Sequence, residues 1–246
     1  YYDNVTVDYN FVAAGDWYCN EETKKTINNI LAVHPELIIT TGDQVKESPS
    51  AACWIQMSEP IKDKMKIAIG NHDYRGVGQL DRYMNHFGLK EQYYSFDYQN
   101  IHFIALSTEV SFNINSVQYK FVKNDLSKAA SDQNIDWIVL YYHRPMYTLP
   151  STHAAISALR SIYPLLFEQY GVNLVLQGHA HTYERTYPLR FNYEDIEEPI
   201  VTSKDLSNYR SIDGLVIATV GTGGAKFTQT CLIPELAAVQ YANLFG

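Results

Sequence analysis

The chain has 246 residues, of which 46% are hydrophobic and 19% charged, and its formal net charge is −8. The length allows one large domain with a well-buried core or two small ones, and the composition is ordinary for a globular protein. The acidic balance argues against a nucleic-acid binder and against a binder of anionic membranes, because both need basic faces. It does not exclude a phosphorylated substrate, because bound metal ions supply positive charge that this count omits.

Short apolar runs predict strands along most of the chain. In chain order they are 11–15, 37–42, 66–70, 93–98, 101–106, 137–142, 173–178, 184–190 and 214–221. Several of these runs are continuously apolar, which is typical of strands that are covered on both faces. Only Gln99 and Asn100 separate 93–98 from 101–106, so these two runs predict an antiparallel hairpin. No apolar run approaches the roughly 18 residues of a membrane span.

Amphipathic segments between the strands predict helices over 21–33, 115–130 and 152–169, each with apolar residues on one helical face. The alternation of strands and helices predicts an α/β fold with a largely parallel sheet. Residues 192–213 are polar and weakly periodic, so we expect a long surface loop there. The chain has no internal repeat, and we expect one domain over 1–246.

Polar residues follow five of the predicted strands at the point where each strand ends. They are Asp16 after 11–15, Asp43 after 37–42, Asn71, His72 and Asp73 after 66–70, His143 after 137–142, and His179 and His181 after 173–178. The carboxyl ends of parallel strands share one edge of a sheet, where ligands bind in open α/β folds. We therefore expect these residues to converge on one crevice.

Carboxylates and imidazoles gathered in one crevice favour a bound cation. Mixed oxygen and nitrogen ligands suit Zn²⁺, Mn²⁺ and iron better than Ca²⁺. About six or seven ligands exceed the needs of one ion, whereas a pair of ions about 3.5–4 Å apart and bridged by a carboxylate accounts for the excess. Any one of these motifs is equally consistent with a solvated turn, but five in this order predict a metal site.

The order GD, GD, GNHD, H and GHxH resembles that of the calcineurin-like metallophosphoesterases. In finer detail AAGDW at 13–17, HRPMYTLPSTH at 143–153 and GHAHTYERTYP at 178–188 resemble the purple acid phosphatase branch. The resemblance runs from about residue 11 to Gly224. It implies an α/β fold with a β-sandwich flanked by helices and a metal site at the C-terminal strand ends. Family members usually continue through further strands, so the implied catalytic domain over 1–246 lacks the last of them.

The resemblance also implies a role for each residue that matches a family motif. Two sets of metal ligands follow, Asp16, Asp43 and His181 for the first ion and Asn71, His143 and His179 for the second, with Asp43 as the bridge. His72 matches the histidine that contacts phosphate and helps to protonate the leaving group. Asp73 would orient His72 and raise its basicity, and His153 matches a second histidine outside the metal coordination.

The implied activity is hydrolysis of phosphate monoesters by a metal-bound hydroxide, as in acid phosphatases, on a small phosphorylated substrate. The cofactors would be two metal ions of iron, zinc or manganese, which lower the pKa of bound water from 15.7 to about 7. An acid such as His72 or His153 would protonate the departing alcohol. Two alternatives stay open, namely a phosphodiesterase or nucleotide pyrophosphohydrolase, and a catalytically weak relative that binds metal or phosphate.

One position departs from the family pattern. The purple acid phosphatase branch has a tyrosine ligand three residues after the bridging aspartate, where this chain has Lys46. Tyr18 lies two residues after Asp16, where the wider superfamily places a histidine ligand to the first metal ion. Tyr18 is therefore either a relocated metal ligand or a packing residue at the rim of the crevice.

The cysteines Cys19, Cys53 and Cys231 also leave two interpretations open. They are either three buried thiols or one Cys19–Cys53 disulfide with a third thiol, because both residues follow motifs that we expect to be neighbours. Asn4 begins a glycosylation sequon. The sequence does not decide the cellular compartment, but it favours a secreted or cell-surface location.

The remaining histidines and two arginines receive no specific role from the sequence. We expect surface or packing roles for His34, His86 and His102, which lie outside the motifs. Arg144 and Arg185 adjoin predicted ligands, and either contact phosphate or form salt bridges.

Overall fold

The computed structural model of the protein describes residues 9–45, 51–148, 153–206, 208–227 and 235–241. Asn4, Lys46 and Cys231 lie outside the described residues, so the expectations about the sequon, the lysine and the third thiol stay predictions. None of the helices in the described part of the chain combines the length and the apolarity that crossing a bilayer requires.

The smaller of the two main sheets is built from the N-terminal part of the chain. Its parallel strands run in the order β1-β2-β3 and are Phe11–Ala14, Leu37–Thr40 and Met65–Ile67. Its outer face is covered by α1 (Glu21–Val33), α2 (Ala51–Ser58), the 3-10 helix η1 (Glu59–Lys64) and α3 (Gln79–His86). Helix α1 begins at Asn20, whose side chain accepts a hydrogen bond from the backbone N–H of Thr23 at 2.9 Å.

The larger sheet has seven strands in the order β12-β8-β11-β7-β6-β5-β4. They are β4 Tyr94–Tyr98, β5 Ile101–Ala105, β6 Trp137–Tyr142, β7 Leu174–Gln177, β8 Tyr183–Thr186, β11 Val216–Val220 and β12 Ala237–Tyr241. Strands β5, β6, β7 and β11 are parallel, and β4 and β8 are antiparallel to their neighbours.

Helices and a small sheet complete this half of the molecule. The helices α4 (Val117–Ala129), α5 (Ser157–Ile162) and α6 (Pro164–Gln169) cover the outer face of the larger sheet. Strands β9 (Leu189–Arg190) and β10 (Ile200–Val201) pair with each other, and the 3-10 helix η2 (Ser211–Asp213) precedes β11. The expected surface loop over 192–213 therefore contains β10 and η2.

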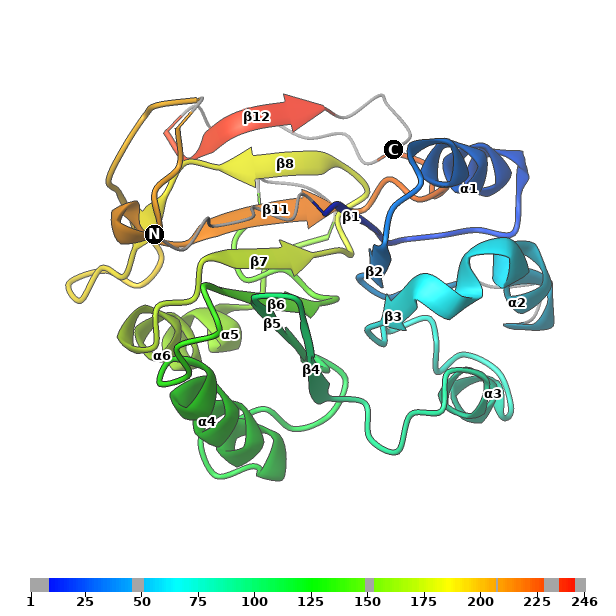
Figure 1. Cartoon of the computed structure of the whole chain (residues 1–246), viewed down its shortest axis with the longest axis horizontal. Helices are drawn as coiled ribbons and strands as arrows, with labels where there is room; N and C mark the ends of the chain where they lie inside the picture. The colour runs from blue at the N-terminus through cyan, green and yellow to red at the C-terminus, as the bar shows by residue number, and fades with distance from the viewer. Residues whose placement is uncertain (1–8, 46–50, 149–152, 207, 228–234, 242–246) are drawn as a thin grey trace, which may run out of the picture.

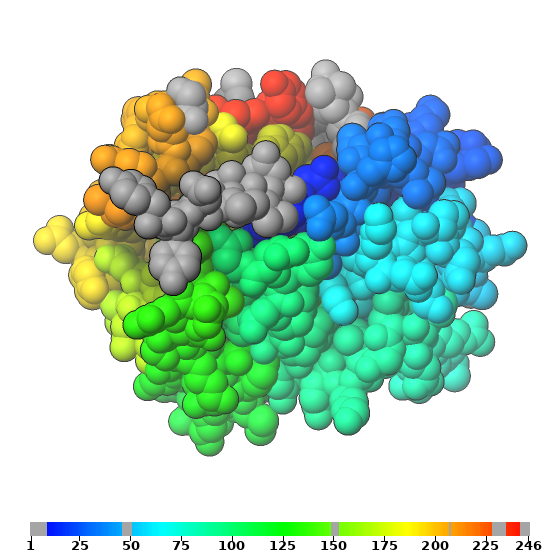
Figure 2. All heavy atoms as spheres, viewed as in Figure 1, coloured from blue at the N-terminus to red at the C-terminus, as the bar shows by residue number. Residues whose placement is uncertain are grey.

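The two sheets pack face to face between the helices, so the layers are helix, sheet, sheet and helix (Figure 1). Ile39 of β2 shares the central core with Phe103 of β5 and Tyr141 of β6. The neighbouring residues Ile38 of β2 and Leu140 of β6 belong to the outer cores beneath the helices. Burial on both faces explains why these strands are continuously apolar. In the space-filling view α1 and α2 occupy one end of the molecule and 190–206 the other (Figure 2).

The structure differs from the sequence expectations at several elements. The motif-bearing strands are divided between two sheets and do not share one largely parallel sheet. Predicted strand 184–190 is split into β8 and β9 around Pro188, and predicted helix 152–169 is split at Pro164, because proline lacks the N–H that both structures need. Helices α2 and α3, at eight residues each, are too short for their apolar periodicity to be recognised.

A disulfide joins Cys19 to Cys53, whose Cα atoms are 6.1 Å apart. The interpretation of three free thiols is therefore wrong for these two cysteines. The bond connects the segment after β1 with α2, and the rings of Trp17 and Trp54 pack edge to face beside it with centroids 6.3 Å apart. The first motif loop is thus fixed both covalently and by aromatic packing.

Candidate metal centre

The predicted ligands lie where the ends of both sheets meet. Backbone hydrogen bonds join the loops that follow the strands: Asp16 N donates to Gly42 O at 3.0 Å, and Gly178 N donates to His143 O at 2.9 Å. Between the sheets, Gly15 N donates to Val220 O at 2.8 Å. The loops after the strands therefore meet as expected, but at the ends of two sheets and not at one edge of a single sheet.

Several of these ligands have a left-handed backbone. The φ angles are 56° at Asp16, 50° at Asp43 and 69° at His179. Residues other than glycine are uncommon in this region, although aspartate and histidine are enriched there. Backbone strain of this kind clusters at functional sites, where the surrounding structure maintains it. Gly70 is required for a different reason, because a Cβ at this position would lie 2.3 Å from Asp43 Oδ1.

His143 lies at the centre of the second predicted ligand set. Its Nε2 is 3.1 Å from Asn71 Oδ1, 3.1 Å from His179 Nδ1 and 3.3 Å from Asp43 Oδ2. Its Nδ1 donates to the Thr41 carbonyl oxygen at 2.9 Å, which orients Nε2 toward the other ligands. Ligand atoms of Asp43, His143 and His179 all lie within 4.8 Å of one another.

The first predicted ligand set lies directly beside the second. His181 Nε2 is 3.6 Å from Asp16 Oδ1, and the second carboxylate oxygen of Asp16 accepts a hydrogen bond from the backbone N–H of His179 at 2.7 Å. His181 Nδ1 donates to the Lys226 carbonyl oxygen at 2.7 Å. Asp16 is therefore in contact with residues of both sets.

Asp43 and His143 form a buried ion pair. Burial opposes the charge of each, but the mutual attraction outweighs it, so the pKa of Asp43 is lowered and the pKa of His143 is raised. Burial lowers the pKa of His179 to about 2, and the positive charges of His143 and His153 act in the same direction. His179 is therefore neutral, which is the form of imidazole that binds a metal ion.

The donor chemistry of this cluster fits a metal ion. Carboxylate oxygens, imidazole nitrogens and an amide oxygen together suit zinc, iron or manganese. A cation bound by these atoms takes the place of the proton that His143 shares with Asp43, because ligands bind metals in their deprotonated form.

The residues predicted to act on the substrate lie beside these ligands. His72 donates its backbone N–H to Asp43 Oδ1 at 2.7 Å, and its Nε2 is 3.8 Å from Asp43 Oδ2. The ring of His153 has its centroid 4.8 Å from that of His179 and 4.7 Å from that of His181. Both histidines are thus in contact with predicted ligands, and their proton-transfer roles stay predictions.

Tyr18 is half-buried close to this cluster. Its backbone N–H donates to Thr23 Oγ1 at 3.0 Å, which fixes the chain between Asp16 and the start of α1. Its role as a relocated metal ligand stays a prediction.

Asp73 connects the loops that follow β2 and β3. Its fully buried carboxylate accepts hydrogen bonds from the backbone N–H groups of Asp43 at 3.1 Å, Gln44 at 2.8 Å and Gly70 at 2.8 Å. Burial and the charge of Asp43 raise the pKa of Asp73, while the bonds from Gly70 and Gln44 act in the opposite direction. Asp73 therefore has a positioning role toward Asp43, and its expected action on His72 stays a prediction.

Sequence reasoning missed two kinds of contact at this edge. The carbonyl oxygens of Thr41 and Lys226 orient two histidines that are predicted ligands, and a backbone group leaves no signal in the sequence. Glu109 pairs with Arg144 and did leave a signal in the sequence. It is the last residue of the segment LSTE, which directly follows the apolar strand β5. It follows the same rule that identified the other strand-end residues.

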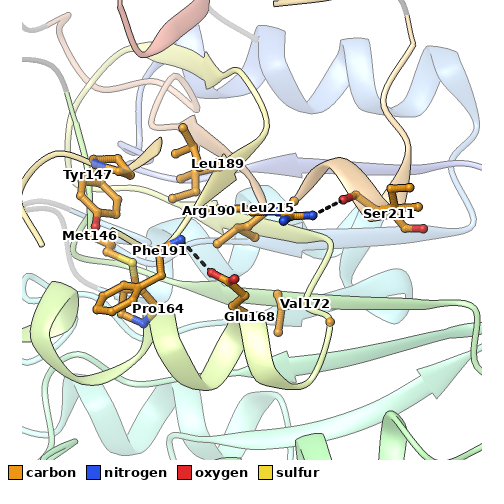
Figure 3. A pocket seen from close by; sticks show the side chains of 15 residues that line it. Met146, Tyr147, Pro164, Glu168, Val172, Leu189, Arg190, Phe191, Ser211 and Leu215 are labelled. Carbon is orange, nitrogen blue, oxygen red and sulfur yellow. Dashed lines mark hydrogen bonds between the residues drawn. The ribbon is translucent and has the colours of Figure 1, made fainter. Parts of the chain in front are cut away.

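A separate cavity of about 310 Å³ lies between α6 and β9 (Figure 3). Its wall is largely apolar and includes Met146. Its two charged groups are engaged by backbone, since Glu168 Oε2 accepts from Phe191 N at 2.8 Å and the Arg190 guanidinium donates to Ile212 O at 2.8 Å. None of the described residues that line it is a predicted ligand, so this cavity is distinct from the candidate metal centre.

Comparisons with known proteins agree with this picture. Residues 9–183 match the family model of the calcineurin-like phosphoesterases. Purple acid phosphatase 23 of Arabidopsis thaliana is 28% identical over an alignment 243 residues long, gaps included, that covers 81% of this chain and 52% of that protein. The chain spans about half the length of the curated relatives it matches.

Two solved structures share the fold. Purple acid phosphatase PPD1 from yellow lupin has a TM-score of 0.72 at 21% identity, over 94% of this chain and 47% of that one. GAP50, described as the anchor in the inner membrane complex of Plasmodium, has a TM-score of 0.66 at 15% identity, over 94% of this chain and 77% of that one.

Proposed function

The chain belongs to the calcineurin-like phosphoesterase family, and from this premise we propose that it hydrolyses phosphate monoesters with the help of two metal ions. The convergence of Asp43, His143 and His179, whose ligand atoms lie within 4.8 Å of one another, carries the proposal. The fold alone does not carry it, because a fold hosts many functions and GAP50, described as an anchor, shares this one.

We assign the ions to the two ligand sets described above. Asp16, Asp43 and His181 would hold the first, and Asn71, His143 and His179 the second, with Asp43 between them. Ions of iron, zinc or manganese supply positive charge that polarises the phosphoryl oxygens and lowers the pKa of water. The net charge of −8 makes this local positive charge necessary for an anionic substrate and argues against nucleic acid as a partner.

The side chains of the protein supply the proton transfer. The backbone N–H of His72 donates to Asp43 Oδ1, and its Nε2 is 3.8 Å from Asp43 Oδ2, so its imidazole lies beside the predicted ligands. We propose that His72 donates a proton to the departing oxygen of the substrate, a task for which imidazole is suited near neutral pH. His153, in ring contact with His179 and His181, is the second candidate donor.

Metal analysis combined with two chromogenic substrates tests this proposal. We expect about two ions per chain and faster hydrolysis of p-nitrophenyl phosphate than of bis(p-nitrophenyl) phosphate, with activity lost on chelation and restored by metal. Preference for the diester would instead identify a phosphodiesterase. Bound metal without turnover of either ester would identify a catalytically weak relative. If the protein is loaded with Fe³⁺, a colourless sample would exclude Tyr18 as a phenolate ligand.

A further inference from the structure

An arginine–glutamate pair lies at the same edge as the candidate metal centre. Arg144 directly follows the predicted ligand His143 at the end of β6, and Glu109 lies beyond the end of β5, which is parallel to β6. The backbone N–H of Arg144 donates to Thr108 Oγ1 at 3.2 Å, which joins the two strand ends. The Cα atoms of consecutive residues are about 3.8 Å apart, so the backbone of Arg144 lies close to that of His143 in the second ligand set.

The geometry of the pair leaves much of the guanidinium available. Arg144 Nε donates to Glu109 Oε1 at 2.8 Å, and its Nη2 donates to Glu109 Oε2 at 3.3 Å. A guanidinium has five N–H donors, so this side-on contact leaves three for another acceptor. The side chain of Arg144 is 32% exposed and that of Glu109 only 11%. The carboxylate is thus buried behind the arginine, whose other edge reaches solvent.

Glu109 is itself held by a chain of hydrogen bonds. Its carboxylate accepts from Thr108 Oγ1 at 3.0 Å, and its backbone N–H donates to Ser107 Oγ at 3.1 Å. Ser107 Oγ donates to Gln92 Oε1 at 2.8 Å, and the same oxygen accepts from the hydroxyl of Tyr74 at 2.5 Å. Tyr74 follows Asp73, so these bonds connect the loop after β3 with the loop after β6.

An ion pair at a protein surface contributes little to stability. The hydrogen bonds behind Glu109 fix a single orientation of Arg144, and a fixed guanidinium binds planar anionic groups well. Because Arg144 directly follows the predicted ligand His143, we infer that the remaining donors are within reach of a substrate bound at the second ligand set. They are therefore suited to a part of the substrate that lies next to the scissile phosphate.

We propose that Arg144, positioned by Glu109, binds a second anionic group of the substrate, such as a second phosphate. The protein would accordingly favour phosphorylated substrates with two anionic groups over those with one. This inference rests on the proposed phosphoesterase function and adds the substrate class. Arg144 is a specificity-determining residue in this account, and Glu109 is a positioning residue.

Inorganic pyrophosphate illustrates the step. A water oxygen forms a bond to one phosphorus, and the bond from that phosphorus to the bridging oxygen breaks. The bridging oxygen leaves with the second phosphate, where negative charge grows and where Arg144 neutralises it. One hydrogen of the water stays on each product, so the fully ionised substrate gives two hydrogen phosphate ions.

The test compares kcat/KM for inorganic pyrophosphate with kcat/KM for p-nitrophenyl phosphate, which has no second anionic group. In Arg144→Gln we expect the ratio to fall by roughly 10- to 100-fold, because a charge-assisted hydrogen bond is lost for only one of the two substrates. Arg144→Lys should lie in between, since lysine keeps the charge and loses the planar fork. An unchanged ratio in Arg144→Gln would overturn the proposal.

Two further variants make the result unambiguous. Arg210→Gln is the matched control, because Arg210 forms a similar two-bond pair with Asp213 beside β11 and should leave the ratio unchanged. Glu109→Gln keeps the charge of Arg144 and removes its positioning, so we expect a fall of about 3- to 10-fold in the ratio. If Arg144→Gln does not fold, an unchanged ratio in Glu109→Gln overturns the proposal.

Binding separates this inference from the proposed function. Affinities of the metal-loaded protein for pyrophosphate and for orthophosphate are measured by titration calorimetry. Tighter binding of pyrophosphate that is lost in Arg144→Gln supports the assignment of Arg144 even if neither substrate is hydrolysed, an outcome that would contradict only the proposed function. Equal affinities for the two anions in the parent protein would overturn the assignment whatever the activity.

Discussion

Two clusters of histidine and aspartate involve the larger sheet, and they differ in how their atoms meet. At the candidate metal centre, Nε2 of His143 lies within 3.1–3.3 Å of atoms from Asn71, His179 and Asp43. At the second cluster, His102 of β5 has one carboxylate on each nitrogen, Asp97 at 2.5 Å from Nδ1 and Asp125 at 3.0 Å from Nε2.

The difference teaches that convergence of donor atoms, rather than residue composition, distinguishes a metal centre from a structural ion pair. In the first cluster several donors face one nitrogen, so a cation takes the place of one proton and engages all of them. In the second cluster the carboxylates lie on opposite sides of the imidazole, and each bonds its own nitrogen. The second cluster therefore stabilises a charged histidine, which agrees with the packing role expected for His102.

Removing one carboxylate from each cluster is the strongest test of the difference between the two clusters. Asp43→Asn should lower metal content and reduce kcat/KM by at least about 100-fold, because even residues outside the coordination shell contribute 10- to 100-fold. Asparagine has the same shape and tolerates the left-handed φ of 50° at this position, so the fold is kept. Elemental analysis and the hydrolysis assay measure both effects.

The matched control is Asp125→Asn. We expect its metal content to equal that of the parent and its activity to stay within about twofold, because Asp125 pairs with His102 in the diverging cluster and not with a predicted ligand in the described part of the chain. Loss of metal in Asp125→Asn, or full metal content in Asp43→Asn, would show that the distinction between the two clusters is wrong.

Asp73→Asn sharpens the comparison by testing how the converging atoms are held in place. The variant should lose about 2–4 kcal/mol in the free energy of unfolding, because the new amide group faces backbone N–H donors and the buried bonds are broken. Urea denaturation of metal-loaded parent and variant measures this loss. If Asp73 instead acts only by raising the basicity of His72, stability will be unchanged and the pH profile of kcat will shift.

The smallest effect is expected at His102. Burial lowers its pKa, but the bonds to Asp125 and Asp97 outweigh burial and raise the pKa above the ordinary value. Its contribution to stability is therefore complete below the unfolded-state value of about 6.5 and is lost as pH rises through the folded-state value. Burial likewise opposes ionisation of Asp125, but His102 lowers the pKa of Asp125, so the contribution of Asp125 is lost only on acidification.

His102→Gln isolates this contribution. We expect the stability difference between parent and variant to be on the order of 1 kcal/mol near pH 6 and to shrink toward pH 9. Chemical denaturation at several pH values measures the difference, and metal content should not change. A difference that grows with pH would mean that His102 is neutral in the folded protein.

The sequence predicts this architecture where physical constraints act locally. The apolar runs that became β1, β2, β6 and β7 are recognisable because both of their faces are buried. The polar residues after these runs are recognisable because five sets of them follow apolar runs in order, although any one set is equally consistent with a solvated turn. The amphipathic pattern that became α1 has a buried face containing Ile27 and Ile30.

The remaining features depend on contacts between distant segments. Strand pairing places β3 beside β2 in the smaller sheet and β6 in the larger sheet. The apolar sequence of each strand does not indicate which strand it pairs with. The carboxylate of Asp73 bonds backbone groups of a loop that lies about thirty residues earlier, so its positioning role is invisible in the GNHD motif. Glu109 was recognisable by the strand-end rule, but its pairing with Arg144 follows only from the fold.

The division of the ligands between two sheets has a consequence for biosynthesis. Of the predicted ligands, Asp16, Asp43 and Asn71 follow strands of the smaller sheet and emerge from the ribosome early, whereas His143, His179 and His181 emerge only with the larger sheet. Domains fold as units, so the N-terminal half of this one remains without its predicted imidazole ligands until the second half has docked. Metal uptake would then report that the whole sandwich has assembled, and the ions would hold its two halves together.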